Sequence, residues 1–233
     1  MEVSHLFESF KRSNVEFYTG VPDSLLKNFC AYITDNVKSK DHIIAANEGA
    51  AIGLATGYHL ATGKIPLVYL QNSGLGNTIN PLLSLADKNV YSVPMVLMIG
   101  WRGEPGSKDE PQHMTQGRVQ NDLLEAIDMP YYILDKNTDD VESFVNELVS
   151  KAKSSSAPVA VVVKAGTFAS YELTNNNDNN LQITREQAIS SIVDCSKSDE
   201  IFVSTTGKTS RELFEIRVSN KQDHQNDFLT VGS

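Results

Sequence analysis

The sequence predicts an α/β fold built on a doubly wound parallel sheet, and three observations lead to it. The chain has 233 residues, of which 40% are hydrophobic and 21% charged, as in ordinary globular proteins. Short apolar runs alternate with stretches of helical periodicity, which is the pattern of a parallel sheet wound by helices. The run VPMVLMIG at 93–100 is apolar throughout, as a strand covered on both faces requires.

Strands and helices are expected to alternate over the first 164 residues. The expected strands are short and rich in β-branched or aromatic residues, at 15–18, 43–46, 66–70, 93–100, 131–134 and 158–164. The expected helices have apolar residues at helical spacing or small residues in a run, at 3–12, 23–33, 48–63, 80–87, 119–127 and 141–153. A polar loop rich in Gly, Pro and charge is expected at 101–117, and loops of that length are usually functional or disordered.

Composition excludes some classes of function. The formal net charge is −9 and the sequence holds no Lys/Arg cluster, which argues against a nucleic-acid surface. No apolar run approaches the ~20 residues that span a bilayer, and the first residues lack the pattern of a secretory signal. We expect a cytoplasmic protein without a membrane segment, whose two cysteines, Cys30 and Cys195, are buried free thiols.

A change in amino-acid composition near residue 174 predicts two domains. The run TNNNDNN at 174–180 is polar and of low complexity, so we expect a linker at 173–181 between a domain at 1–172 and a second α/β domain at 182–233. The second is shorter than the ~100 residues of a usual domain and is expected to be incomplete. Its TTGKTS turn is no P-loop, because that motif needs glycine where Phe202 stands.

Glu48 is the first candidate functional residue. It stands among small and apolar residues in NEGAAIGLATGY at 47–58, where a strand is expected to give way to a helix. A carboxylate at that place is either a favourable charge at a helix N-terminus or a partly desolvated acid whose raised pKa lets it hold or pass a proton. Position alone leaves both interpretations open.

Two further segments border expected strand ends. Asp23, in GVPDS at 20–24, is either a helix N-cap or a second functional carboxylate. QNSGLGN at 71–77 directly follows the strand expected at 66–70, and ligands of open α/β sheets collect at the carboxyl ends of strands. The segment is therefore either a tight turn or a place where backbone approaches a ring or phosphate.

Charged and polar residues at 101–118 complete the candidates. His113 has the chemistry to move a proton near neutral pH, and Arg102 or Arg118 could form forked contacts to a carboxylate or phosphonate. Each of the three could equally be a solvated surface residue.

Four motifs together resemble the pyrimidine-binding domain of thiamine-diphosphate-dependent 2-oxoacid decarboxylases: GVPDS, NEGAAIGLATGY, QNSGLGN and GWRGEPGSKDEPQHMTQGR at 100–118. In that family a glutamate hydrogen-bonds N1′ of the aminopyrimidine and promotes loss of the thiazolium C2 proton, which makes the cofactor an electron sink. The resemblance implies that Glu48 is this glutamate, with His113 and Asp23 as further catalytic groups.

The resemblance also implies which residues contact the cofactor and the substrate. Cofactor contacts are expected from Gly20, Val21, Pro22, Glu48, Asn72, Gly74, Gly76 and Asn77. Substrate contacts are expected from Ser24, Gln112 and Arg118. The implied cofactors are thiamine diphosphate and Mg²⁺, and the family's metal ligands lie in a Gly-Asp-Gly…Asn motif that this sequence lacks. No metal ligand is therefore expected here, and we expect a sequence truncated before that motif and inactive alone.

Within the family, the motifs are most similar to the branch that decarboxylates 3-phosphonopyruvate to phosphonoacetaldehyde in phosphonate biosynthesis, for example toward 2-aminoethylphosphonate. Decarboxylation of sulfopyruvate is the near alternative, and a non-catalytic pyrimidine-binding subunit is the alternative from another class. In the family the active site forms between two subunits. The resemblance therefore implies a homo-oligomer, at least a dimer, that takes a small 2-oxoacid.

Overall fold

The computed structural model describes residues 1–174, 182–205 and 207–231. The chain divides into two compact units, Met1–Asn175 and Asn176–Ser233. The division falls within the linker expected at 173–181, of which residues 175–181 lie outside the described residues. The assignment of two domains stays a prediction, and each unit is described by itself.

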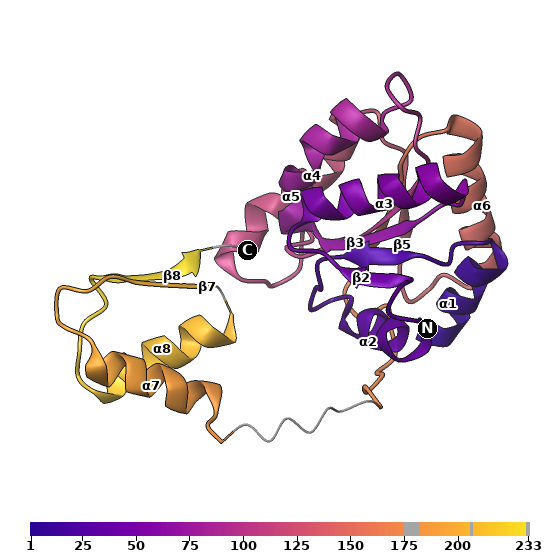
Figure 1. The fold of residues 1–233 in the computed structure, drawn as a ribbon. Helices are drawn as coiled ribbons and strands as arrows, with labels where there is room; N and C mark the ends of the chain where they lie inside the picture. The colour runs from indigo at the N-terminus through magenta and orange to yellow at the C-terminus, as the bar shows by residue number, and fades with distance from the viewer. Residues whose placement is uncertain (175–181, 206, 232–233) are drawn as a thin grey trace. The chain divides into compact units, whose positions relative to one another are not determined.

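The first unit is built on a parallel sheet of six strands in the order β2-β1-β3-β4-β6-β5 (Figure 1). The strands are β1 (Tyr18–Gly20), β2 (His42–Ile44), β3 (Leu67–Gln71), β4 (Val96–Gly100), β5 (Tyr131–Leu134) and β6 (Val159–Val163). The chain steps from β1 outward to β2 and then returns to β3 on the other side of β1, so the order reverses between β1 and β3. The predicted α/β fold with a parallel sheet is confirmed.

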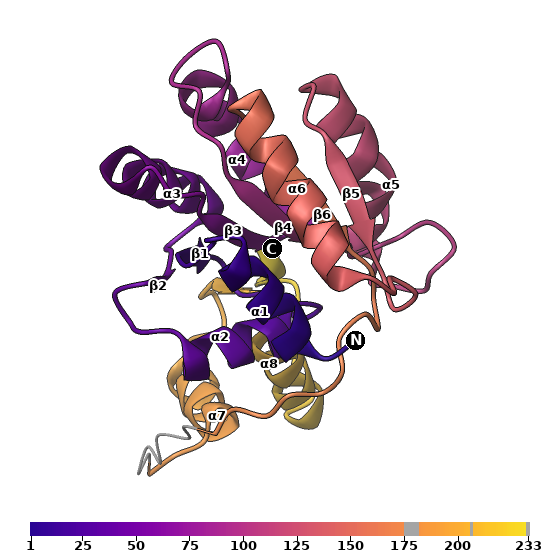
Figure 2. The same cartoon turned by 90° about the vertical axis from the view of Figure 1, so that its right-hand side faces the viewer.

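Helices cover both faces of this sheet. They are α1 (Val3–Arg12), α2 (Lys27–Asn36), α3 (Glu48–Thr62), α4 (Leu75–Pro81), α5 (Pro111–Ala126) and α6 (Val141–Ser155). Figure 1 shows α3 and α2 on opposite sides of the strands. Figure 2 shows α1 and α6 side by side, joined by hydrogen bonds from Arg12 to Glu142 and from Ser13 to Asn146.

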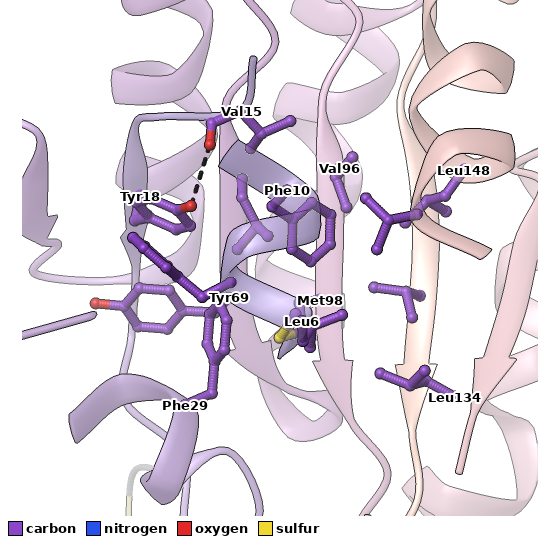
Figure 3. Packing of buried hydrophobic residues seen from close by; sticks show 14 of the residues in the cluster. Leu6, Phe10, Val15, Tyr18, Phe29, Tyr69, Val96, Met98, Leu134 and Leu148 are labelled. Atoms are coloured by element: carbon purple, nitrogen blue, oxygen red, sulfur yellow. Dashed lines mark hydrogen bonds between the residues drawn. The ribbon is translucent and has the colours of Figure 1, made fainter. Parts of the chain in front are cut away.

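The strands divide their side chains between two hydrophobic cores because successive residues point to opposite faces. Leu67 and Tyr69 of β3 join the core under α1, α2 and α6, whereas Val68 and Leu70 join the core under α3 and α5. Figure 3 shows the first core, in which Leu6 and Phe10 of α1 lie near Met98 and Val96 of β4. All of the residues named here are buried.

Two helices begin earlier than the sequence suggested. The helix expected at 80–87 begins at Leu75, where a glycine turn was one of the two interpretations. Pro81 is the last residue of α4, and the π-helical turn η2 (Leu82–Ala86) follows. The helix expected at 119–127 begins at Pro111. Proline suits the first turn of a helix, since its missing N–H has no partner there anyway. The loop expected at 101–117 therefore ends at Glu110.

The second unit is a small α/β element. Its elements are α7 (Arg185–Cys195), β7 (Phe202–Thr205), α8 (Lys208–Ser219) and β8 (Asp227–Val231), and the two strands pair in parallel. Thr184 caps α7 in a capping box with Gln187. Its buried core contains Val193, Leu213 and Ile216. Cys30 of the first unit is buried as expected, but Cys195 is exposed, so the expectation of two buried thiols was wrong for Cys195.

None of the described helices is long and apolar enough to pass through a membrane.

Candidate active site

Several of the predicted site residues lie just after the carboxyl ends of β1, β3 and β4, three neighbouring strands. The segments that leave these strands begin at Val21, Asn72 and Trp101. The order of the sheet reverses between β1 and β3, and in open α/β sheets ligands bind at such a switch point. The fold thus places GVPDS and QNSGLGN at the position where a ligand is expected.

Glu48 is the first residue of α3 and is half-buried. The side chain of the N-cap Asn47 accepts a hydrogen bond from the Ala50 amide at 2.8 Å, which fixes the start of the helix. Oε2 of Glu48 accepts a hydrogen bond from Nδ2 of Asn77 at 3.1 Å. The carboxylate that the sequence singled out is therefore held by a residue from the predicted cofactor-binding segment.

Gly74 gives the Glu48 carboxylate its space. A Cβ atom at position 74 would lie 2.3 Å from Oε1 of Glu48, which no real contact allows. QNSGLGN is not a tight turn: Asn72–Gly74 forms a 3₁₀ helix, η1, that continues directly into α4. A Cβ atom at Gly76 would have no other atom within 4 Å. Of the two glycines, only Gly74 therefore stands where a side chain would clash.

Asp23 is the second carboxylate at this edge, and it is buried, with 5% of its surface exposed. Its Oδ2 accepts hydrogen bonds from the amides of Leu25 and Leu26 at 3.0 and 3.2 Å, and a Cβ at Gly100 would lie 2.2 Å from the same atom. Oδ1 is buried without a partner among the described residues. The pKa of Asp23 is raised by burial. The hydrogen bonds from the two amides and the positive charge of Arg102 lower this pKa, but burial has the larger effect.

Asp23 is therefore not the N-cap of α2. That position belongs to Leu26, and no side chain caps the helix there. Asp23 instead closes the turn that precedes the helix.

Arg102 follows β4 and is held by a forked ion pair. Its Nε and Nη2 donate to Oδ2 and Oδ1 of Asp109 at 2.8 and 2.5 Å, and Nη1 donates to Oγ of Ser24 at 2.9 Å. Asp109 also accepts hydrogen bonds from the amides of Gly103 and Glu110, both at 2.8 Å. These bonds, first of all those from Arg102, hold the pKa of Asp109 far below its ordinary value.

Asn72 joins the ends of β3 and β4. Its Nδ2 donates to the carbonyl oxygen of Arg102 at 2.7 Å, and its Oδ1 accepts from the Arg102 amide at 3.2 Å. The Asn72 side chain is buried, and both its nitrogen and its oxygen bond the Arg102 backbone. A continuous series of contacts thus runs from Glu48 through η1 and Asn72 to Arg102 and Ser24.

His113 lies in the first turn of α5, and not in a loop as expected. It is 5% exposed, and its Nδ1 is buried with no partner among the described residues. Burial lowers its pKa, and the charge of Arg102 adds to that effect, against the opposite influence of Asp109 and Glu110. Burial therefore favours the neutral form of its imidazole.

The other predicted substrate residues are less engaged. Gln112 is half-buried, and Arg118 is exposed on α5. The sequence reasoning missed Asp109, although a carboxylate seven residues after Arg102 and just before a Glu-Pro helix start was visible. The described residues hold no group of three or more His, Cys, Asp and Glu side chains that could bind a metal ion.

Residues 3–125 match the family described as thiamine pyrophosphate enzyme, N-terminal TPP binding domain. The chain belongs to this family. The match spans the segments that place Glu48, Asp23, Asn72, Arg102 and His113, so the resemblance inferred from the motifs is confirmed.

Curated relatives lie in two groups. The chain is 30% identical over 229 residues to phosphonopyruvate decarboxylase of Streptomyces viridochromogenes, a match that covers 92% of the chain and 55% of the relative. It is 32% identical over 160 residues to sulfopyruvate decarboxylase subunit alpha of Methanococcus maripaludis, covering 69% of the chain and 92% of that subunit. The chain thus spans about half the length of the phosphonopyruvate decarboxylases that it matches.

Among solved structures, the thiamine diphosphate-dependent 4-hydroxybenzoylformate decarboxylase of Rhodococcus jostii RHA1 is similar with a TM-score of 0.50 at 19% identity. The similarity covers 91% of this chain and 41% of that one, and it shows a shared fold.

The Arg102–Asp109 pair predicts a pH-dependent contribution to stability. The folded-state pKa of Asp109 lies below its unfolded value of about 3.9. The ionised carboxylate therefore stabilises the fold at pH values above the unfolded-state pKa. This contribution is lost as the pH falls from there through the folded-state pKa. Between pH 6 and pH 3, we expect the free energy of unfolding to fall less steeply in Asp109→Asn than in the wild type, as measured by urea unfolding. Asp122→Asn, at an exposed position on α5, is the control, and equal slopes for Asp109→Asn and wild type would contradict the prediction.

Proposed function

We propose that the chain is the pyrimidine-binding part of a thiamine-diphosphate-dependent decarboxylase that converts 3-phosphonopyruvate to phosphonoacetaldehyde and CO₂. The observation that carries the proposal is the Glu48 carboxylate at the switch point of the sheet, with Oε2 held by Asn77 and Oε1 against Gly74. Membership of the family and the similarity to phosphonopyruvate decarboxylases support it.

The residues present fit the aminopyrimidine of thiamine diphosphate. Position 74 has no side chain, so nothing at that position displaces Oε1 of Glu48. Oε1 has no hydrogen-bond donor among the described residues, and it is therefore able to accept one from a ring nitrogen. We further propose backbone and side-chain contacts from the other predicted cofactor residues, and we assign Mg²⁺ and the diphosphate to ligands outside the described residues.

The chain's own residues would divide the proton chemistry. Thiamine diphosphate supplies the electron sink that decarboxylation of a 2-oxoacid requires. Glu48 would hold or accept a proton at Oε1. Asp23 and His113, whose buried Oδ1 and Nδ1 have no partner among the described residues, would hold or accept a proton at those atoms.

The assembly is part of the proposal. We propose a cytoplasmic homo-oligomer, at least a dimer, with active sites between subunits, in which residues 1–172 form the pyrimidine-binding domain and 182–233 begin a second domain. The pathway would be phosphonate biosynthesis.

Sulfopyruvate is the second candidate substrate, because it differs from phosphonopyruvate only in its anionic head group. The alpha subunits of sulfopyruvate decarboxylase are matched over nearly their whole length, but the match covers 69% of this chain. The match to phosphonopyruvate decarboxylase covers 92% and continues into the second unit, which favours the phosphonate. A non-catalytic subunit is the third possibility.

Side-by-side assays separate these candidates. We expect the native gene product, supplied with thiamine diphosphate and Mg²⁺, to release CO₂ from phosphonopyruvate at least ~10-fold faster than from sulfopyruvate, and to lose that activity when the cofactors are removed. A reversed preference would assign the sulfonate, and a folded protein that binds the cofactor but turns over neither substrate would favour the non-catalytic subunit.

Gly74→Ala tests the fit of the cofactor. Its methyl group would displace the flexible end of Glu48, so we expect thiamine diphosphate to bind about 10-fold more weakly or worse, with little change in stability. Gly76→Ala adds the same methyl group to open space two residues later and serves as the matched control. Calorimetric titration of the native gene product measures both affinities, and equal affinities in the two variants would count against the assignment of Glu48.

A further inference from the structure

Arg102 presents a second binding edge that the ion pair with Asp109 leaves open. A guanidinium has five N–H donors and two forked edges that match an oxyanion. Asp109 occupies the edge formed by Nε and Nη2. At the edge formed by Nη1 and Nη2, Nη1 donates to Oγ of Ser24 at 2.9 Å. Because each of these nitrogens carries two N–H groups, at least one donor at this edge is available to another anion.

Asp109 orients Arg102 before any ligand arrives. The Asp109 carboxylate is itself fixed by hydrogen bonds from the amides of Gly103 and Glu110. The forked ion pair with this carboxylate therefore fixes the orientation of the Arg102 guanidinium. The Arg102 side chain is 21% exposed and Ser24 is exposed, so the open edge is accessible from solvent. A cation fixed in this way loses little conformational entropy when it binds an anion.

Two buried polar atoms in the segments that contact Arg102 and Gly103 lack partners among the described residues. They are Oδ1 of Asp23 and Nδ1 of His113, and both residues are 5% exposed. Asp23 precedes Ser24, to whose hydroxyl Arg102 donates, and the backbone of His113 packs against Gly103, the residue after Arg102. Because buried polar groups nearly always have a hydrogen-bond partner, two such atoms in the segments packed around Arg102 and Gly103 indicate a place that a polar ligand completes.

Physical chemistry decides which anion of the substrate belongs there. A 2-oxoacid with a phosphonate or sulfonate group carries two anionic groups, but the carboxylate loses its charge as CO₂ leaves. A fixed cation on that carboxylate would stabilise the ground state more than the transition state and slow the reaction. The head group keeps its charge throughout, so a cation on it aids binding without opposing decarboxylation.

We propose that the open edge of Arg102, together with the hydroxyl of Ser24, binds the tetrahedral anionic head group of the substrate and so sets the preference for phosphonate or sulfonate 2-oxoacids. This inference rests on the proposed function and deepens it. Arg102 takes the task that was expected of Arg118, which is exposed on α5. Asp109 is a positioning residue for Arg102.

Kinetics with two substrates test the assignment. In the native gene product, Arg102→Ala is expected to lower kcat/KM for phosphonopyruvate by about 10- to 100-fold, mainly through KM, because a charged hydrogen-bonded contact is lost. Pyruvate has no anionic head group, so its kcat/KM is expected to change by less than about 3-fold. Arg12→Ala, which removes an exposed ion pair to Glu142, is the matched control and should change neither value.

Two kinetic results would overturn the proposal. An equal loss for both substrates in Arg102→Ala would show that Arg102 only holds the loop together. A selective loss in Arg118→Ala, with Arg102→Ala unaffected, would move the head-group site to Arg118.

A binding experiment decides the same question without turnover. In the wild type and in Arg12→Ala, the melting temperature is expected to be higher with phosphonoacetate than with acetate at the same concentration. In Arg102→Ala, the two melting temperatures are expected to be equal. If the gene product decarboxylates nothing, the proposed function fails while this comparison still tests Arg102. No phosphonoacetate-specific shift in the wild type, or the same shift in Arg102→Ala, would overturn the proposal.

Discussion

The candidate site depends on two hydrogen bonds between the Asn72 side chain and the backbone of Arg102. They join the carboxyl ends of β3 and β4, from which the glycine segment and the arginine loop depart. The Asn72 amide is buried, so breaking either bond would cost about 1–3 kcal/mol for an unsatisfied polar group. This cost fixes η1, and with it Gly74 and the Glu48 carboxylate, relative to Arg102 and Ser24. The site is therefore assembled by the ends of adjacent strands and requires no long loop.

The two carboxylates at this edge have different environments, and this difference supports different roles. Asp23 is buried, receives two amide hydrogen bonds at one oxygen and has a raised pKa. Glu48 is half-buried at the start of a helix, with one oxygen held by Asn77. Each carboxylate lies against a glycine: Asp23 against Gly100 and Glu48 against Gly74. A Cβ atom at either glycine would come closer to the carboxylate than real Cβ contacts allow. The sequence shows glycines near both acids, but only the folded chain shows which glycine serves which acid.

Local pattern predicted the sheet well, because strands covered on both faces are continuously apolar and the intervening helices have their own periodicity. It failed where tertiary packing overrides propensity. Leu75 and Thr78 are buried against the rest of the first unit, which makes a helix of a segment whose two glycines and asparagine suggested a turn. Pro111 was a visible helix start, but the polar residues after it suggested a loop, so His113 was placed on the wrong kind of element.

The motifs predicted Glu48, Asp23 and Asn72 at the site because strand ends of a parallel sheet meet at one edge. The exposure of Arg118 on α5 could not be predicted in this way, because a helix turns successive residues to different sides; its role as a substrate contact stays a prediction. The forked pair between Arg102 and Asp109 depends on how the short loop between them folds, which no periodicity encodes. The most direct test of the role of Glu48 is the rate at which bound thiamine diphosphate exchanges its C2 proton for deuterium in the native gene product. We predict a fall of about 100-fold or more in Glu48→Gln, and exchange at the native rate in that variant would contradict this role.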